Sequence, residues 1–587
     1  MRSESRADQR RTRLRLSRET LLLAAILVGA AALRLFGLNW DDGQWLHPDE
    51  RQIYFVVEGL DWPHSLTEAL SPDSPLNPRF FAYGSLPIYL LKLVTALLAL
   101  LWPALRSESN LHLVGRPLAV LFDLGTVYLT YRLARVLFPS PSSRRGLRGD
   151  ALVAAAFVGL AVLHVQLARF YTADPLLTFF VMLTLNMGAD VAQGRGWRRQ
   201  VALGIALGLT LATKVSAAPL ILVVLVALDV RRRTHQTGWS AVILSAIGIL
   251  AVAAVVFLLA QPYVLIDWRT FVDQTAREAQ IARGTLATPY TLQYAGTTPF
   301  LYSMWQTALW GLGLPLGLVA WAGLTTVLIR WLRHAPRAES LLLAWVGPYF
   351  VVTGLLYTRY LRYMLPLTPI LCILGIRLLV SLKQRRLRVA ATWVLIGVTL
   401  IYSLAFVSIY ATPHSWVTAS EAIYWEVPAG SVLAVEHWDM ALPLPLEMDG
   451  RARRQSEYDM RFLALYDEPD DAAKWESLAG DLASSDYLII ASRRLYGSIP
   501  RVPDRYPVAT RYYALLFGGG LGFELEHEFT RGPVWLNPRL PPLSDPAPAL
   551  LHPDESFVVY DHPRALVFHN AEHLPGAELL RRLGVGQ

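Results

Sequence analysis

The chain has 587 residues, of which 53% are hydrophobic and only 17% are charged, well below the roughly 25% of charged residues in a typical soluble domain. This composition indicates a membrane protein. The formal net charge is +8, but the basic residues form short clusters between apolar runs, which argues against nucleic-acid binding. The single cysteine, Cys372, excludes a disulfide framework and a cysteine-built metal site.

Apolar runs long enough to cross a bilayer as helices recur after a basic N-terminal segment, residues 1–18. Residues 200–230 have arginines beyond both ends, so we expect a hairpin with Thr213 and Lys214 near its tip. The other predicted spans are 19–38, 114–137, 151–168, 175–192, 240–262, 300–329, 340–358, 361–380 and 390–410.

Residues 84–102 have the hydropathy of a further span, but the distribution of positive charge argues against a crossing there. Cytoplasmic loops are rich in lysine and arginine. If residues 84–102 do not cross, all later basic clusters face the cytoplasm. We therefore expect an interfacial helix at 84–102, eleven crossings in total and an external C-terminus. The clusters are 144–148, 195–199, 231–233, 330–337 and 383–388.

The same topology places loops 39–113 and 263–299 outside, and the first of them carries many acidic residues. The segment FVDQTAREAQIARG in the second loop is expected to form a surface helix. From residue 412 the composition is that of a soluble domain, and the runs SVLAVE, DYLIIAS, ESFVVYDH and ALVFHN are typical of strands. The predicted fold is a polytopic α-helical membrane protein, with a membrane domain at 19–411 and an external α/β domain at 412–587.

Several cations lie at the outer ends of predicted spans, where the positive-inside rule disfavours them. Any one of them is explained by a side chain that reaches the lipid headgroups. As a set they are more typical of ionisable groups that face a cavity and pair with an anion. They are Arg34, Arg116, Arg169, Lys214, Arg359 and Arg362.

Two motifs, HPDE at 47–50 and TADP at 172–175, place carboxylates at predicted helix starts near these cations. Helix capping and the helix dipole explain Asp49, Glu50 and Asp174 without any function. A carboxylate that takes a proton from a hydroxyl, opposite cations that stabilise a departing phosphate, is also a workable transfer site. From the residues alone, both interpretations stay open.

The chain resembles the C-type glycosyltransferases of the family 39 type, which include protein O-mannosyltransferases and aminoarabinose transferases, and it looks like a bacterial member. The resemblance covers roughly residues 19–410. It rests on the order and spacing of PDE at 48–50, SLPIYLL, GRPLAVLFD, ARFYTADPLLTFF, LGLTLATK and RYLRYMLPLTP.

The resemblance implies an enzyme of the cell membrane that transfers a sugar, with inversion, from a polyprenyl-phosphate donor to a hydroxyl on the outer face. The acceptor, a protein, lipid or glycan, stays open. Asp49 would be the catalytic carboxylate, supported by Glu50 and Asp174. No cofactor is certain, although external acids can hold a divalent metal. The residues expected at the donor phosphate are Arg116, Arg169, Lys214, Arg359, Arg362 and Tyr363.

One departure from the family pattern concerns the start of the interfacial helix. Aminoarabinose transferases have lysine-proline-proline there, whereas this chain has Gly84-Ser85-Leu86-Pro87. A phosphate contact at this point would have to come from another cation, and the candidates are Arg79, Lys92 and Lys214.

Two functions of other classes compete with a transferase. A transporter or flippase for a lipid-linked glycan also needs cations near a phosphate, but it predicts charges throughout the membrane depth and inverted repeats. A membrane sensor with an external ligand-binding domain needs far fewer spans. EHWD at 436–439 can bind a metal ion but is more typical of a polar strand end.

Overall fold

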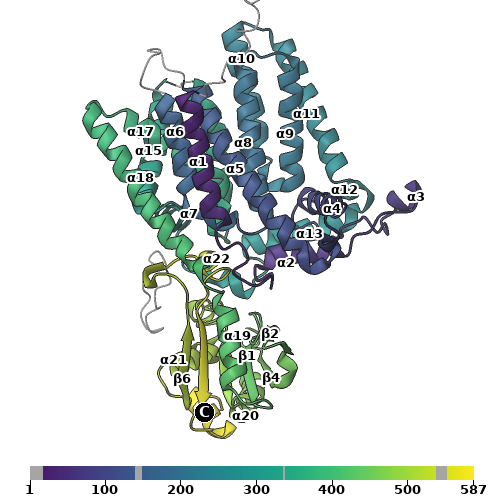
Figure 1. The fold of residues 1–587 in the computed structure, drawn as a ribbon, viewed down its shortest axis with the longest axis vertical. Helices are drawn as coiled ribbons and strands as arrows, with labels where there is room; N and C mark the ends of the chain where they lie inside the picture. The colour runs from purple at the N-terminus through teal and green to yellow at the C-terminus, as the bar shows by residue number, and fades with distance from the viewer. Residues whose placement is uncertain (1–16, 139–147, 335–336, 537–551, 587) are drawn as a thin grey trace, which may run out of the picture.

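The computed structural model describes residues 17–138, 148–334, 337–536 and 552–586. A bundle of long helices forms one part of the molecule, and a smaller domain with a β-sheet is attached to one end of it (Figure 1). The bundle helices are α1 (Arg18–Leu35), α5 (Leu111–Leu137), α6 (Arg148–Leu160), α7 (Val162–Leu167), α8 (Ala173–Ala192), α9 (Trp197–Thr213), α10 (Leu220–His235), α11 (Trp239–Ala260), α15 (Leu314–His334), α16 (Arg337–Leu355), α17 (Thr368–Val380) and α18 (Arg385–Val407).

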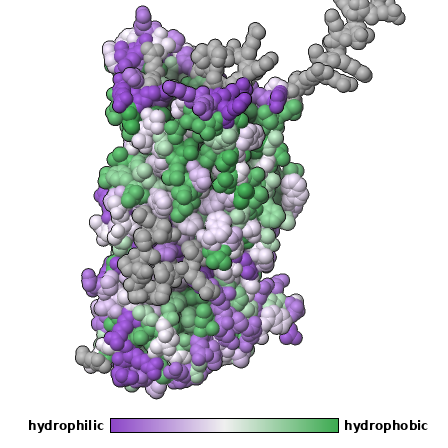
Figure 2. Space-filling view, turned by 90° about the vertical axis from the view of Figure 1, so that its left-hand side faces the viewer, coloured by the Kyte–Doolittle hydropathy of each residue, from purple (hydrophilic) through white to green (hydrophobic). Residues whose placement is uncertain are grey.

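Seven helical segments within the described residues are long and apolar enough to cross a membrane. Figure 2 shows the corresponding apolar belt, with a polar band beyond it at the end opposite the C-terminal domain. The protein is therefore a multi-pass membrane protein, and the predicted fold class is confirmed. The count of eleven crossings stays a prediction. The seven segments contain α5, α8, α11, α15, α16, α17 with the turn before it, and α18.

The helical hairpin predicted at 200–230 is present. Helix α9 ends at Thr213, and α10 begins at Leu220 after a short turn that contains Lys214. The amide of Gly84 donates to the carbonyl of Thr213 over 2.9 Å, which fixes the hairpin tip to the first long loop. The basic clusters at 195–199 and 231–233 consequently lie at the far end of the bundle (Figure 1). Most of the cluster at 144–148 and part of that at 330–337 lie outside the described residues.

Three predicted spans are interrupted in the structure. The span at 151–168 divides into α6 and α7, because Ala161 has an extended backbone. The break frees the carbonyls of Val158 and Gly159, which accept hydrogen bonds from the buried guanidinium of Arg34. The span at 300–329 divides into α14 (Leu301–Gln306), a π-turn and α15, and the span at 361–380 begins with a 3-10 turn (Leu361–Leu367) before α17.

Short helices cover the end of the bundle that faces the C-terminal domain (Figure 1). The apolar helix predicted to be interfacial, α4 (Leu86–Leu98), has 13 residues. At about 1.5 Å per residue it is about 20 Å long, which is too short for a hydrocarbon core of about 30 Å. Its length agrees with the interfacial prediction. The other helices here are α2 (Pro48–Glu58), α3 (Leu66–Ala69), α12 (Tyr263–Ile266) and α13 (Trp268–Arg283), the surface helix expected in the second loop.

The C-terminal domain contains a five-stranded sheet in the order β4-β1-β5-β7-β6. β1 is parallel to both neighbours, and β7 is antiparallel to β5 and β6. Its strands are β1 (Val432–Glu436), β4 (Asp459–Leu463), β5 (Tyr487–Ile490), β6 (Phe523–Phe529) and β7 (Ala565–Asn570), with a separate hairpin of β2 (Leu446–Met448) and β3 (Arg451–Arg453). The helices are α19 (Ser415–Glu426), α20 (Ala472–Ser484), α21 (Pro507–Phe517), α22 (Glu555–Val558) and α23 (Gly576–Leu583).

One strand prediction in this domain is wrong. The run ESFVVYDH contains the short helix α22 and a loop, packed against the membrane domain. Asp554 caps the helix by accepting from the amide of Ser556, and Gln166 of α7 donates to the carbonyl of Phe557. Because bundle and capping side chains satisfy this backbone, it needs no neighbouring strand. The other three runs coincide with β1, β5 and β7.

Candidate functional site

Two acids and two cations from four distant segments meet where the bundle joins the C-terminal domain. Arg362 Nη1 lies 2.9 Å from Asp49 Oδ2, and Arg362 Nε lies 3.9 Å from Asp174 Oδ2. Lys214 Nζ lies 3.2 Å from Asp174 Oδ1. We name these four residues the charged cluster. Their side chains are only 7% to 19% exposed, so their charges interact in a poorly hydrated environment.

Aromatic side chains line the charged cluster. The Lys214 ammonium lies 5.2 Å from the centre of the Tyr363 ring and 5.7 Å from that of Tyr83. Burial and the nearby charge of Asp49 raise the pKa of the Tyr83 hydroxyl. The Arg362 guanidinium lies over the Tyr360 ring at 4.6 Å. Such faces stabilise cations while they restrict access of water.

The C-terminal domain contributes directly to this region. Arg362 Nη1 donates to the hydroxyl of Tyr560 over 3.1 Å. The Tyr560 ring also packs against His47, with a centroid separation of 4.0 Å. Residues of the loop after α22 therefore complete one wall of the charged cluster.

The start of α2 separates two neighbouring acids. Pro48 occupies the first turn, and His47 Nδ1 accepts the amide of Asp49 over 3.1 Å. Successive residues of an α-helix point about 100° apart. Asp49 therefore faces Arg362, whereas Glu50 faces the interior of the bundle.

Glu50 belongs to a separate buried network. Its carboxylate lies 2.9 Å from Arg116 and also accepts from the Tyr54 hydroxyl and the Tyr171 amide. Arg116 is held by a second carboxylate, that of Asp41, at 2.6 Å. Two internal acids therefore neutralise Arg116, and these ion pairs link the first loop to α5. Glu50 and Arg116 are not part of the charged cluster.

The other predicted cations are also internal. Arg34 pairs with Asp123 at 2.6 Å. Arg169 donates to the carbonyls of Leu33 and Phe36 and lies 3.6 Å from the centre of the Tyr410 ring. Arg359 donates to Thr297 Oγ1 over 2.6 Å, away from the charged cluster.

The interpretation that these side chains reach the lipid headgroups is wrong for three of the cations. Arg34, Arg116 and Arg169 are at most 1% exposed. They therefore stay inside the protein and bind internal carboxylates or carbonyls.

The other candidate cations considered for the lipid phosphate lie elsewhere. Lys92 donates to the carbonyl of Leu60 over 2.6 Å, and Arg79 pairs with Asp73 on the surface. Of the three, Lys214 alone belongs to the charged cluster.

The electrostatics of the α2 start keep Asp49 ionised. Burial alone would raise the pKa of Asp49, but the positive charge of Arg362, with His47 and Tyr83, holds that pKa below 3.8. Burial lowers the pKa of His47 to about 4. His47 is therefore neutral at pH 7, in agreement with its ring nitrogen accepting the Asp49 amide. Burial and the charge of Asp49 raise the pKa of Glu278 of α13.

Metal-binding groups are scarce in the described part of the chain. No three His, Cys, Asp or Glu side chains there are placed to hold one metal ion. At EHWD, Glu436 ends β1 and accepts from the Tyr513 hydroxyl over 2.7 Å. This geometry is that of a polar strand end.

Sequence reasoning missed His47, Tyr83, Glu278 and Tyr560. A signal for the last of these is present in the chain, since HPDE at 47–50 occurs again at 552–555. In the second copy, Asp554 accepts from the hydroxyls of two tyrosines of the membrane domain. The repeated motif thus lies in a segment of the C-terminal domain that contacts the bundle, and Tyr560 follows a few residues later in the same segment.

Residues 89–260 match the family model of dolichyl-phosphate-mannose-protein mannosyltransferases. The resemblance to C-type glycosyltransferases is confirmed. The match spans less than a third of the chain and contains Asp174 and Lys214, whereas Asp49 and Arg362 lie outside it. No curated protein sequence matches the chain.

Solved structures of membrane glycosyltransferases are similar in part. The archaeal oligosaccharyltransferase AglB from Archaeoglobus fulgidus, in complex with an inhibitory peptide and a dolichol-phosphate, is 14% identical, covering 86% of this chain and 72% of that one, with a TM-score of 0.47. ArnT from Cupriavidus metallidurans bound to undecaprenyl phosphate is 16% identical, covering 94% and 98%, with a TM-score of 0.42. The S. cerevisiae protein O-mannosyltransferase Pmt1-Pmt2 complex bound to the sugar donor is 17% identical, covering 44% and 35%, with a TM-score of 0.32.

Proposed function

We propose that this protein transfers a sugar from a polyprenyl-phosphate carrier to an acceptor hydroxyl, with inversion at the anomeric carbon. The observation that carries the proposal is the charged cluster at the end of a membrane bundle, in which Asp49 and Asp174 share Arg362 and Asp174 also pairs with Lys214. The family match at 89–260 supports the same reaction class. The sugar and the acceptor, whether protein, lipid or glycan, are left open.

In the proposed reaction, the oxygen of the acceptor hydroxyl attacks the anomeric carbon while Asp49 takes the proton of that hydroxyl. The bond from that carbon to the phosphate oxygen breaks, and polyprenyl phosphate leaves with the electron pair. Lys214 and Arg362 stabilise the negative charge that develops on the phosphate. Attack opposite to the leaving group inverts the configuration.

Arg362 couples donor binding to base strength. Without donor, its guanidinium pairs with Asp49 and keeps the pKa of that carboxyl low. A donor phosphate that binds Arg362 weakens this pairing, so the pKa of Asp49 rises and the carboxylate becomes a better base. Asp49 would thus be activated when the phosphate is in place.

The remaining predicted site residues receive different roles in this proposal. Asp174 holds Lys214, and Tyr363 provides the ring beside the Lys214 ammonium. The contacts of Glu50, Arg116, Arg169 and Arg359 favour structural roles behind the site, in the networks described above.

We infer that the charged cluster and the C-terminal domain are extracytoplasmic. The support is the position of the basic clusters at 195–199 and 231–233, at the opposite end of the bundle from the hairpin tip. Cytoplasmic loops are enriched in such clusters.

The proposal is tested with membranes that contain the protein and a panel of labelled undecaprenyl-phosphate sugars. Asp49→Asn keeps the shape of the side chain and removes the base, so label transfer should fall by about 10²-fold or more. The matched control is Asp73→Asn, on an exposed acid of the same loop, which should transfer label normally. A folded Asp49→Asn protein with near-normal transfer would refute the assignment of the base.

A further inference from the structure

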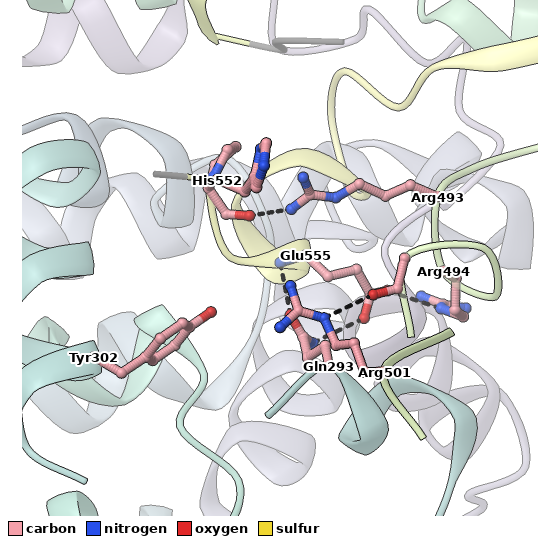
Figure 3. A pocket seen from close by; sticks show the side chains of 9 residues that line it. Gln293, Tyr302, Arg493, Arg494, Arg501, His552 and Glu555 are labelled. Atoms are coloured by element: carbon pink, nitrogen blue, oxygen red, sulfur yellow. Dashed lines mark hydrogen bonds and ion pairs between the residues drawn. The ribbon is translucent and has the colours of Figure 1, made fainter. Parts of the chain in front are cut away.

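A second polar pocket lies between the membrane domain and the C-terminal domain. Arg493, Arg494 and Arg501 from the segment after β5 line it together with His552. Figure 3 shows Tyr302 of the membrane domain on the other side, with its hydroxyl directed toward the arginines. The pocket is thus built by both parts of the molecule.

The positive charge of this pocket exceeds its negative charge. Arg494 is paired with Glu555 at 2.8 Å. The hydrogen bonds of the other two guanidinium groups within the described residues go to backbone carbonyls: Arg493 donates to Pro553, and Arg501 Nε donates to Gly497 over 3.0 Å. Two arginine charges therefore have no carboxylate partner in the described part of the chain.

The positive charges of Arg493 and Arg501 repel each other and disfavour a protonated His552. Burial lowers the pKa of Arg501, and the charge of Arg493 lowers it further. Burial and both arginines lower the pKa of His552 to about 4. Partly buried cations of this kind are stabilised by an anion that binds between them.

The donors that line the pocket define the kind of anion. Its accessible volume of about 30 Å³ exceeds the space needed for one water molecule. A guanidinium group binds oxyanions through two parallel hydrogen bonds. Two guanidinium groups and an imidazole offer donors to more oxygens than a carboxylate has, which favours a tetrahedral oxyanion.

We propose that this pocket is a phosphate-binding site in which Arg493 and Arg501 are the principal ligands and His552 is a further donor. The phosphate can come from inorganic phosphate or from the headgroup of a lipid. The site is separate from the charged cluster, and the proposal does not depend on the transfer reaction.

The test uses the full-length protein in detergent, titrated with inorganic phosphate at constant ionic strength and followed by calorimetry. We expect saturable binding of one phosphate per chain. Arg493→Gln or Arg501→Gln should weaken it at least tenfold, because each removes a charge-assisted pair of hydrogen bonds. The control is Arg451→Gln, on an exposed residue of β3, which should bind as the wild type does. Thermal midpoints in chloride verify that each variant is folded.

A second arm distinguishes the source of the phosphate. Nanodiscs with phosphatidic acid are compared with nanodiscs of phosphatidylcholine alone, and the thermal midpoint is recorded. A rise with phosphatidic acid that disappears in Arg501→Gln, without binding of inorganic phosphate, assigns the site to a lipid headgroup. If neither probe binds saturably, or if both variants bind like the wild type, the proposal is overturned.

Discussion

Arg362 bridges Asp49 and Asp174, with its guanidinium 2.9 Å from the first carboxylate and 3.9 Å from the second. One cation thereby holds together the start of α2 and the start of α8. The charge on Asp49 and the position of Asp174 both depend on this side chain.

Replacing Arg362 with Gln should shift the pH dependence of transfer. In the protein without donor the pKa of Asp49 lies below 3.8, so at subsaturating donor, where the rate reports the donor-free protein, the base is lost only as pH falls through that low pKa. Without the guanidinium, burial dominates and the pKa rises, which moves the acidic limb to higher pH. Transfer at pH 7 should also fall by about 10² or more, as the leaving phosphate loses a cation.

The measurement is the rate of label transfer between pH 3.5 and 7. Arg79→Gln, which removes an exposed cation of the first loop, serves as the control and should leave the profile unchanged. An acidic limb at the wild-type position in Arg362→Gln would show that this arginine does not set the pKa of the base.

Tyr560→Phe should slow transfer about fivefold. The substitution removes the hydroxyl that accepts from Arg362 and keeps the ring against His47. A single hydrogen bond to a charged group is worth about 1 kcal/mol or more. Tyr512→Phe, in the core of the C-terminal domain, is the control. Equal rates for Tyr560→Phe, Tyr560→Ala and the wild type would exclude a positioning role.

Gly84→Ala should displace the hairpin tip. A methyl group at residue 84 would overlap the backbone of Ala212, and the bond from the Gly84 amide to Thr213 would be lost. We expect a loss of about 1 to 3 kcal/mol in stability and at least tenfold weaker binding of undecaprenyl phosphate, because Lys214 moves with the tip. Gly29→Ala, where the added methyl group would meet no atom within 4 Å apart from the local backbone of its own helix, should have neither effect. Identical behaviour of the two variants would contradict this prediction.

Glu50→Gln should act mainly on folding, in contrast to Asp49→Asn. It removes one of the two carboxylates that neutralise the buried Arg116. Loss of one partner of a buried ion pair typically costs about 3 kcal/mol or more. Thermal unfolding should therefore show a clearly lower midpoint, with transfer per folded molecule largely kept. A normally stable but inactive variant would assign Glu50 to the reaction.

Glu436 should make the stability of the C-terminal domain depend on pH. Burial raises its pKa to about 8, against 4.5 in the unfolded chain. The domain is favoured while Glu436 is protonated, so the contribution of this group to stability is fully present below pH 4.5 and is lost as pH rises toward 8. The loss amounts to at most about 5 kcal/mol. Chemical denaturation at pH 5.5 and 8.5 measures it, and Glu436→Gln should remove most of the difference. Equal pH dependence in the variant would contradict the assignment.

Local sequence was sufficient for the membrane class, the positions of most long helices and the hairpin with Lys214 at its tip. Hydropathy and flanking charge act within a single helix or turn, so no distant contact was needed to predict these features. The helix start at Pro48 and Asp49 was likewise visible, because capping is a property of a few consecutive residues.

Tertiary structure decided which of those residues meet. Asp49 and Glu50 are neighbours in sequence, yet the rotation of α2 directs one to Arg362 and the other to Arg116. Arg34 of another helix satisfies a carbonyl at the break before Ala161, and Gln166 of the bundle satisfies a carbonyl within ESFVVYDH. Such outcomes follow from pairings between segments far apart in the chain, which local periodicity and charge do not determine.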